Sequence, residues 1–276
     1  MLALAVLPFL LTGAMLLADR LARRIGGSVL PSAASARGLL VLSTVSIVSH
    51  PILDSLNTYG VRWLMPFDGR WFYGDAVFIV DPWLWLALGL GVILSRRRWK
   101  DGRGYAVEPT RPARMALLFT AVYAGVMALS GIAARRIATR ELRLRTGAAM
   151  DAIMLSPMPV IPFSRTVVAA QGDRYLVGRF RWLAAPRLDP ASLRIFPRGR
   201  PAHPAVDAAL ATTVGRRFLG WARFPTYQVE PRADGEFVVH IVDLRYADRP
   251  GVSFGSVSVP VTLPPVRARP GGGAGP

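Results

Sequence analysis

The chain has 276 residues, of which 52% are apolar, a formal net charge of +17 and no cysteine. The lack of cysteine excludes disulfide bonds and thiolate metal sites. Such a charge would suit a nucleic-acid-binding protein. However, the basic residues flank long apolar runs, where positive charge orients membrane helices and contacts anionic lipid head groups. We therefore expect the lipid bilayer as a partner and no nucleic acid.

The N-terminal half contains four apolar runs, each close to the about 20 residues that a helix needs to cross a bilayer. They are residues 1–18, 38–56, 76–95 and 115–134. The first run is followed by Asp19 and three arginines rather than by a small-residue cleavage site, which is typical of an anchor and not of a signal peptide. The sequence predicts an α-helical transmembrane domain over residues 1–134 with about four spans.

The loops between these runs differ in charge. Residues 19–37 contain four Arg and one Asp, and residues 96–114 contain seven basic and two acidic residues, whereas residues 57–75 are balanced. The positive-inside rule places the two basic loops in the cytoplasm, and residues 57–75 and the C-terminal half outside. Five arginines between residues 135 and 145, directly after the fourth run, favour the opposite side.

The second half is more polar. A basic, Pro-rich linker over residues 135–162 leads into stretches rich in Val, Phe and Tyr that turn residues separate. The predicted strands are 166–170, 175–182, 227–230, 236–246 and 256–263, with a short helix over 205–219. We expect a small β-rich (α+β) soluble domain over 163–264 and a disordered tail over 265–276.

Two ionisable residues interrupt the second apolar run. His50 and Asp54 are four residues apart and share one face of a helix, where an imidazole nitrogen and a carboxylate oxygen can hold one divalent metal ion. Ionisable side chains inside a membrane span are costly and mark functional sites. Two alternatives stay open: the pair is a structural hydrogen bond, or the helix ends at Ser49.

A metal centre needs more than two ligands. Asp68, Asp75 and Asp81 are the further candidates, and Asp75 and Asp81 each have a structural alternative as a helix N-cap. Asp81 either caps a helix that starts at Pro82 or turns its carboxylate towards His50. The other two histidines, His203 and His240, have no partner at ligand spacing and are interpreted as structural. No catalytic residue is assigned.

Several stretches resemble one family of membrane proteins. They are His50-Pro-Ile-Leu-Asp54, Thr58-Tyr-Gly60, Leu64-Met-Pro-Phe67, Trp71-Phe72, Asp75 and Phe78-Ile-Val-Asp-Pro82, and more weakly Ala222-Arg-Phe-Pro225 and Val242-Asp-Leu-Arg-Tyr246. Together they are similar to the membrane-bound, metal-dependent hydrolases described as LexA-regulated, YdjM-like inner-membrane proteins.

The resemblance implies a multi-pass protein of the bacterial inner membrane with a bound divalent metal ion, zinc. The His-x-x-x-Asp element looks like that of zinc-dependent phospholipase C and related nucleases. By this likeness His50 and Asp54 are metal ligands, a metal-bound water is the nucleophile, and the substrates are phospholipids or other phosphodiesters.

Family members also carry an Asp-rich segment and a His-Arg-Gly-x-Thr-His-Ser motif before the first apolar run. Neither is present here, so the sequence looks like a family member that lacks its first two or three helical segments. We therefore expect weak metal binding and little or no hydrolase activity from this chain. The alternative is a non-catalytic, membrane-anchored protein whose C-terminal β-domain binds a partner.

Overall fold

The computed structural model describes residues 2–28, 35–100, 108–232, 235–246 and 254–263. The chain divides into two compact units. The helical unit comprises Met1–Ala133 and Ser156–Pro162, and the sheet unit comprises Ala134–Leu155 and Phe163–Pro276. The predicted order of a helical N-terminal region followed by a strand-rich C-terminal region is confirmed.

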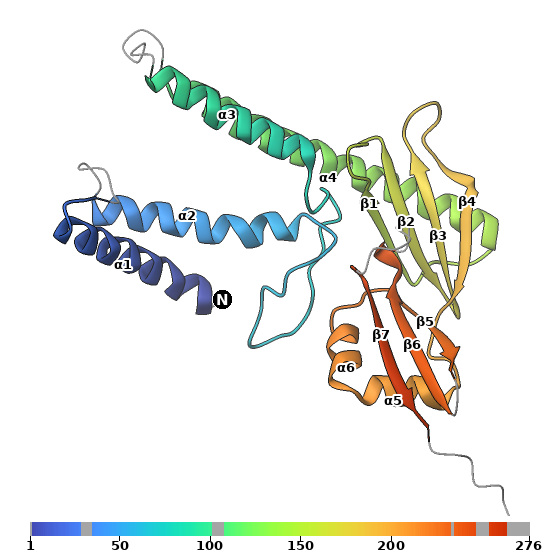
Figure 1. The fold of residues 1–276 in the computed structure, drawn as a ribbon. Coiled ribbons are helices and arrows are strands. Elements are labelled where there is room, and N and C mark those ends of the chain that lie inside the picture. Colours follow the sequence, from blue (N-terminus) through green and yellow to red (C-terminus); the bar gives the residue numbers. More distant parts are fainter. Residues whose placement is uncertain (1, 29–34, 101–107, 233–234, 247–253, 264–276) are drawn as a thin grey trace, which may run out of the picture. The chain divides into compact units, whose positions relative to one another are not determined.

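Four long helices account for the N-terminal region (Figure 1). They are α1 (Leu2–Arg24), α2 (Ala36–Ser55), α3 (Pro82–Lys100) and α4 (Arg111–Thr146). Within the described residues, three helical segments are long and apolar enough to cross a membrane: Ala3–Arg24, Ala36–Ser55 and Arg111–Thr146.

The predicted span over residues 76–95 is not among these three segments. The helix begins only at Pro82, because the backbone of residues 76 and 77 turns back to hydrogen-bond the Leu56 carbonyl. From Pro82 to Ser95 the apolar part of α3 is about 21 Å long at 1.5 Å per residue, shorter than the about 30 Å hydrocarbon core. Arginines follow at once.

The helices of this unit pack as two pairs. α1 lies against α2, with the hydroxyl oxygens of Thr12 and Ser43 3.2 Å apart between them. α3 lies against α4 at Gly91, where an added Cβ would come within 2.6 Å of the Ala116 Cβ. Small residues allow this close approach, as is usual between membrane helices.

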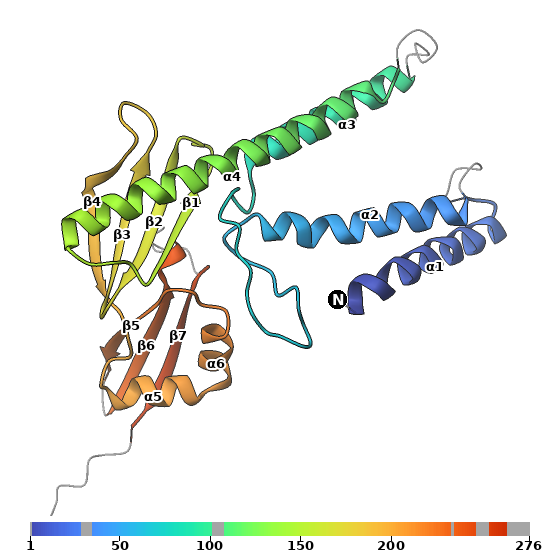
Figure 2. The ribbon, with the colours of Figure 1, turned by 180° about the vertical axis from the view of Figure 1, so that it is seen from behind.

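The second half of α4 belongs to the sheet unit. Its buried residues Ala134, Ala138 and Leu142 join Val167 and Phe180 in one apolar cluster. Figures 1 and 2 show this part of α4 along one face of the β1–β4 sheet. Residues 135–146 were expected in a linker but are helical. Alanine and leucine side chains line one face of this helical segment and pack against the sheet.

The five arginines after the fourth apolar run occupy the other side of this helical segment. They are exposed: Arg135, Arg136, Arg140, Arg143 and Arg145. They form the solvated face of an amphipathic helix that covers a sheet. Their charge is thus accommodated on the exposed face of a helix that belongs to the sheet unit.

The first sheet has the strand order β1-β2-β3-β4, so each strand lies beside its neighbour in the sequence. The strands are β1 (Ala152–Pro157), β2 (Ser164–Gln171), β3 (Arg174–Arg181) and β4 (Arg187–Pro197). The predicted hairpin around Gly172 is confirmed, with Gln171 opposite Arg174. β1 was not predicted because it lies in the stretch expected to be a Pro-rich linker, and β4 was not predicted because prolines and arginines interrupt its apolar residues.

The second sheet is antiparallel, with the order β5-β6-β7. Its strands are β5 (Pro225–Pro231), β6 (Glu236–Asp243) and β7 (Ser256–Thr262). Two short helices, α5 (Pro204–Ala211) and α6 (Thr213–Leu219), pack against it and bury residues such as Val206. The single helix predicted over 205–219 is split because Thr212 caps α6.

Candidate functional site

The pair predicted from the sequence is formed at the C-terminal end of α2. The helix continues through His50 to Ser55, so it does not end at Ser49. His50 Nε2 lies 3.3 Å from Asp54 Oδ2, with 82% of the His50 side chain and 38% of the Asp54 side chain exposed. The imidazole nitrogen and the carboxylate oxygen therefore face each other on an accessible surface.

This separation fits two ligands of one metal ion. With bonds of about 2.1 Å and a tetrahedral angle, two donor atoms lie about 3.4 Å apart. The same distance also suits a hydrogen bond from a protonated or neutral imidazole to a carboxylate. The donor atoms are therefore compatible with a divalent ion and with a plain ion pair.

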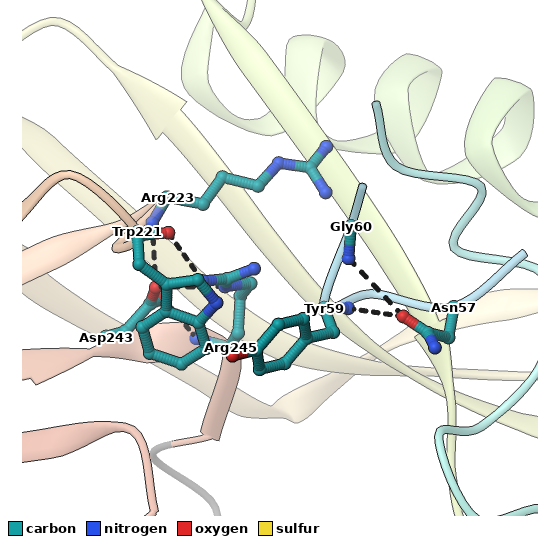
Figure 3. Close-up of polar contacts among 7 residues, drawn as sticks. All are labelled: Asn57, Tyr59, Gly60, Trp221, Arg223, Asp243 and Arg245. Carbon is teal, nitrogen blue, oxygen red and sulfur yellow. Dashed lines mark hydrogen bonds and ion pairs between the residues drawn. The ribbon is translucent and has the colours of Figure 1, made fainter. Parts of the chain in front are cut away.

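A third residue orients Asp54, and the sequence patterns did not single it out. Asn57 is buried, and its side-chain nitrogen lies 3.4 Å from Asp54 Oδ1. The Asn57 side-chain oxygen accepts hydrogen bonds from the backbone N–H groups of Tyr59 (2.8 Å) and Gly60 (3.3 Å), as Figure 3 shows. Asn57 thereby links the carboxylate to the turn that follows α2.

The segment after α2 folds back tightly on the end of that helix. A Cβ on Gly74 would come within 2.4 Å of the Ser55 carbonyl oxygen, so only glycine lets the two backbones approach this closely. Trp63 Nε1 donates a 2.7 Å hydrogen bond to Ser55 Oγ. The Thr58-Tyr-Gly60 and Trp71–Asp75 stretches, noted for their family resemblance, thus build the support of the His50–Asp54 pair.

The structure gives Asp81 the role of a helix cap. Its Oδ1 accepts hydrogen bonds from the backbone N–H groups of Trp83 (3.0 Å) and Leu84 (3.4 Å). Its Oδ2 accepts one from the Tyr123 hydroxyl on α4 at 3.0 Å. The expected N-cap of a helix starting at Pro82 is confirmed, and both carboxylate oxygens of this buried residue have protein partners.

Asp75 is also buried and lies beside the end of α2. Its backbone has a positive φ of 50°, and its N–H donates to the Asn57 carbonyl at 3.4 Å. It does not cap α3, since that helix starts seven residues later. Across the described ranges, no three His, Cys, Asp or Glu side chains lie close enough together to hold a metal ion.

The neighbouring Asp68 is held by Arg70. Its carboxylate accepts hydrogen bonds from the Arg70 backbone N–H (2.8 Å) and from Arg70 Nε (2.6 Å). The backbone hydrogen bond, followed by the guanidinium, lowers the pKa of Asp68 below its usual value. Asp68 is therefore an ionised partner of Arg70.

The two remaining histidines have the structural roles expected of them. His203 Nδ1 accepts from the Ala205 N–H and caps α5. His240 lies 3.0 Å from a Glu230 carboxylate oxygen and 2.8 Å from Ser258 Oγ.

The sheet unit contains a buried charged cluster that the sequence patterns did not predict (Figure 3). Asp243 and Arg245 form a 2.8 Å ion pair, and both side chains are fully buried. The Asp243 carboxylate also accepts the Arg223 N–H at 2.7 Å, and Arg245 donates to the Trp221 carbonyl at 3.0 Å. The guanidinium stacks on the Trp221 ring, 4.4 Å from its centroid.

This cluster joins two stretches of the second half that were noted in the sequence. The Ala222–Pro225 and Val242–Tyr246 stretches are far apart in sequence, and the Asp243–Arg245 pair fastens one to the other. The contacts of Asp243 and Arg245 hold these two stretches together, so the cluster has a structural role. Only knowledge of strand pairing could have revealed it, because a single Asp-Leu-Arg sequence carries no signal of burial.

Comparisons with known proteins agree with the helical unit. The family described as YdjM inner membrane protein matches residues 1–137. No curated protein and no solved structure matches the chain. Together with three helices able to cross a membrane, the match shows that this is a membrane protein. Over its N-terminal half, the chain belongs to the YdjM inner membrane protein family.

Proposed function

We propose that this protein is a multi-pass protein of the bacterial inner membrane in which His50 and Asp54 supply two ligands to a divalent metal ion, zinc, that acts on phosphoesters. The observation that carries the proposal is the 3.3 Å separation of His50 Nε2 and Asp54 Oδ2 on one exposed helix face. A carboxylate and an imidazole are ligands that zinc prefers.

The surroundings of the pair support a ligand role for Asp54. The Asn57 side chain contacts the carboxylate oxygen that does not face His50. A hydrogen bond to the oxygen that does not bind the metal holds a ligating carboxylate in one orientation. When bound, the ion would polarise a phosphoryl oxygen and lower the pKa of a bound water. His50 and Asp54 would hold the ion and Asn57 would position Asp54.

Two ligands bind an ion weakly, and the described residues bring no third donor to the pair. We therefore expect weak zinc binding and little or no hydrolase activity from the chain by itself. The substrates that the family resemblance implies are phospholipids or other phosphodiesters, which a bilayer supplies next to the pair.

The arrangement of the helical unit supports four crossings. The Tyr123–Asp81 hydrogen bond and the Gly91–Ala116 contact align α3 with α4 in antiparallel directions. The whole of α3 is about 28 Å long at 1.5 Å per residue, and its terminal arginines and lysine can extend to the head groups. The irregular residues before α3 are tolerated in a bilayer because protein buries them, as Ala76 and Val77 show.

The same arrangement supports the orientation. Residues 56–81 join the C-terminal end of α2 to the N-terminal end of α3, so the arginine-rich ends of α1 and α3 lie on the opposite side of this unit. Basic helix ends favour the cytoplasm. The His50–Asp54 pair and residues 56–81 then lie towards the external side.

Zinc content of the purified full-length protein tests the metal proposal. Wild type and the variants His50→Ala and Asp54→Ala are equilibrated in detergent with buffered zinc, and bound zinc is measured by mass spectrometry. We expect wild type to hold more zinc than either variant by about tenfold, since two ligands act together. His240→Ala, which breaks another His–carboxylate pair, is the matched control and should equal wild type.

One observation favours the non-catalytic alternative: the ion pair satisfies His50 and Asp54 without any ion. In that case wild type and all variants hold equally little zinc, and His50→Ala and Asp54→Ala only lower the unfolding temperature. The sheet unit would then be the functional part and would bind a partner.

A further inference from the structure

The loop between β1 and β2 has an unusual composition for a protein surface. Residues 158–163, Met-Pro-Val-Ile-Pro-Phe, are all apolar. Val160 and Ile161 at its tip are 57% and 50% exposed. A run of exposed apolar residues in a loop marks a surface that contacts another apolar surface or a membrane.

The tip is held in a strained shape that keeps these side chains outward. Val160 has a φ of 67°, a left-handed conformation that β-branched residues rarely adopt. The Ile161 N–H donates to the Pro159 carbonyl at 2.8 Å, which closes a three-residue γ-turn. A β-branched residue in this conformation is strained, so contacts with another segment must anchor the tip.

The helical unit supplies that anchor. Trp83, in the first turn of α3, donates a 3.1 Å hydrogen bond from Nε1 to the Val160 carbonyl. At the base of the loop, the Ser156 and Thr58 hydroxyl oxygens lie 3.4 Å apart. The loop segment Ser156–Pro162 accordingly belongs to the helical unit.

The position of Tyr123 along α4 gives the depth of this anchor in the membrane. Tyr123, which holds Asp81 at the start of α3, comes nine residues after Arg114, the last basic residue before the apolar run of α4. At 1.5 Å per residue Tyr123 lies about 14 Å from that basic end, within a hydrocarbon layer of about 30 Å. Trp83 is two residues beyond Asp81, so the Val160 carbonyl lies at a similar depth.

We propose that residues 158–163 are a membrane-inserted loop, whose Val160 and Ile161 side chains contact lipid acyl chains beside α3. The occupant of this surface is the bilayer that the helical unit already spans, because the loop is continuous with that unit through Trp83. The inference requires only that α4 crosses the membrane and is independent of any metal centre.

The absence of cysteine makes the test direct, since one introduced cysteine is the only thiol in the protein. The full chain with Ile161→Cys is labelled with an environment-sensitive NBD dye and reconstituted into vesicles of phosphatidylethanolamine and phosphatidylglycerol. Quenching by aqueous iodide is compared with quenching by lipids that carry a doxyl group on an acyl chain.

Two further positions calibrate the result. Ile195→Cys, a 64% exposed isoleucine on β4 at the end of the sheet away from the β1–β2 loop, reports the aqueous phase, and Leu42→Cys, a 67% exposed leucine on α2, reports lipid. We expect iodide to quench the label at 161 at least about threefold less than at 195, because hydrocarbon excludes ions. Doxyl lipid should quench 161 and 42 alike.

Iodide quenching at 161 equal to that at 195 would overturn the proposal. So would protection of 161 from both iodide and doxyl lipid, which would mean that a second copy of the chain or another protein covers the loop. Val160→Cys repeats the measurement at the neighbouring position and must give the same answer.

Discussion

The helical unit and the sheet unit bury opposite kinds of side chain. On the helices, large apolar residues such as Leu42 and Leu129 are exposed, whereas Thr12, Ser43 and Asp81 are buried. In the sheet unit, Phe180 and Ile241 are fully buried. Because the solvent of a membrane helix is hydrocarbon, its polar groups must find partners inside the protein. The contrast shows where the environment of the chain changes.

The two units also satisfy their buried charges differently. Asp81 in the helical unit receives two hydrogen bonds from the next turn of its own chain and one from Tyr123. Asp243 in the sheet unit is paired with Arg245, two residues along the chain, and also accepts the N–H of Arg223, 20 positions away. Each carboxylate combines partners close in the chain with a distant one, and Asp243 has in addition a buried cation as its partner.

The largest effect is expected from Arg245→Met, which removes the cation of the fully buried pair. Breaking such a pair leaves an uncompensated buried carboxylate and should reduce the free energy of unfolding by about 3–5 kcal/mol. Denaturant unfolding of the full chain in detergent, followed by tryptophan fluorescence, measures it. Arg232→Met breaks an exposed pair with Glu230 and should cost less than about 1 kcal/mol. Equal costs for both variants would contradict the burial argument.

An intermediate effect is expected where α3 meets α4. Gly91→Ala places a methyl group 2.6 Å from the Ala116 Cβ and 3.2 Å from the Pro112 carbonyl oxygen, so the helices must separate. Overpacking of this kind costs about 1–3 kcal/mol. Gly89→Ala, on the same helix with open space around it, should be neutral or slightly stabilising. Thermal unfolding in detergent compares the two variants, and a similar loss in both would show that α3 does not pack on α4 at Gly91.

The smallest effect concerns pH and the exposed surface of the second sheet. The hydrogen bond with His240, followed by the charge of Arg232, lowers the pKa of Glu230 from its ordinary value of 4.5. Because the folded pKa lies below the unfolded one, the stabilisation is complete above pH 4.5 and is lost as the pH falls through the folded pKa. Glu230→Gln should therefore flatten the loss of stability on acidification. Denaturant midpoints at neutral and acid pH measure this, with Glu236→Gln as the charge control; an unchanged pH dependence would refute it.

Much of the candidate site was predictable because its contacts join residues that are close in the sequence. The four-residue spacing of His50 and Asp54 fixes their contact once the segment is helical, and the residue before Pro82 is a natural helix cap. Asn57 escaped prediction because its role depends on the turn that follows α2. The third apolar run was misplaced by six residues, because hydropathy alone does not show that residues 76–81 fold back on Leu56.

The sequence by itself determined the membrane character, the order of helical and strand-rich regions, and the face on which His50 and Asp54 meet. These properties follow from composition and from the period of one helix. Only the tertiary structure decided that α4 extends to cover a sheet, that Asp243 and Arg245 are buried, and that the β1–β2 loop is anchored by Trp83. Each of these depends on residues distant in the chain, whose pairing no local pattern encodes.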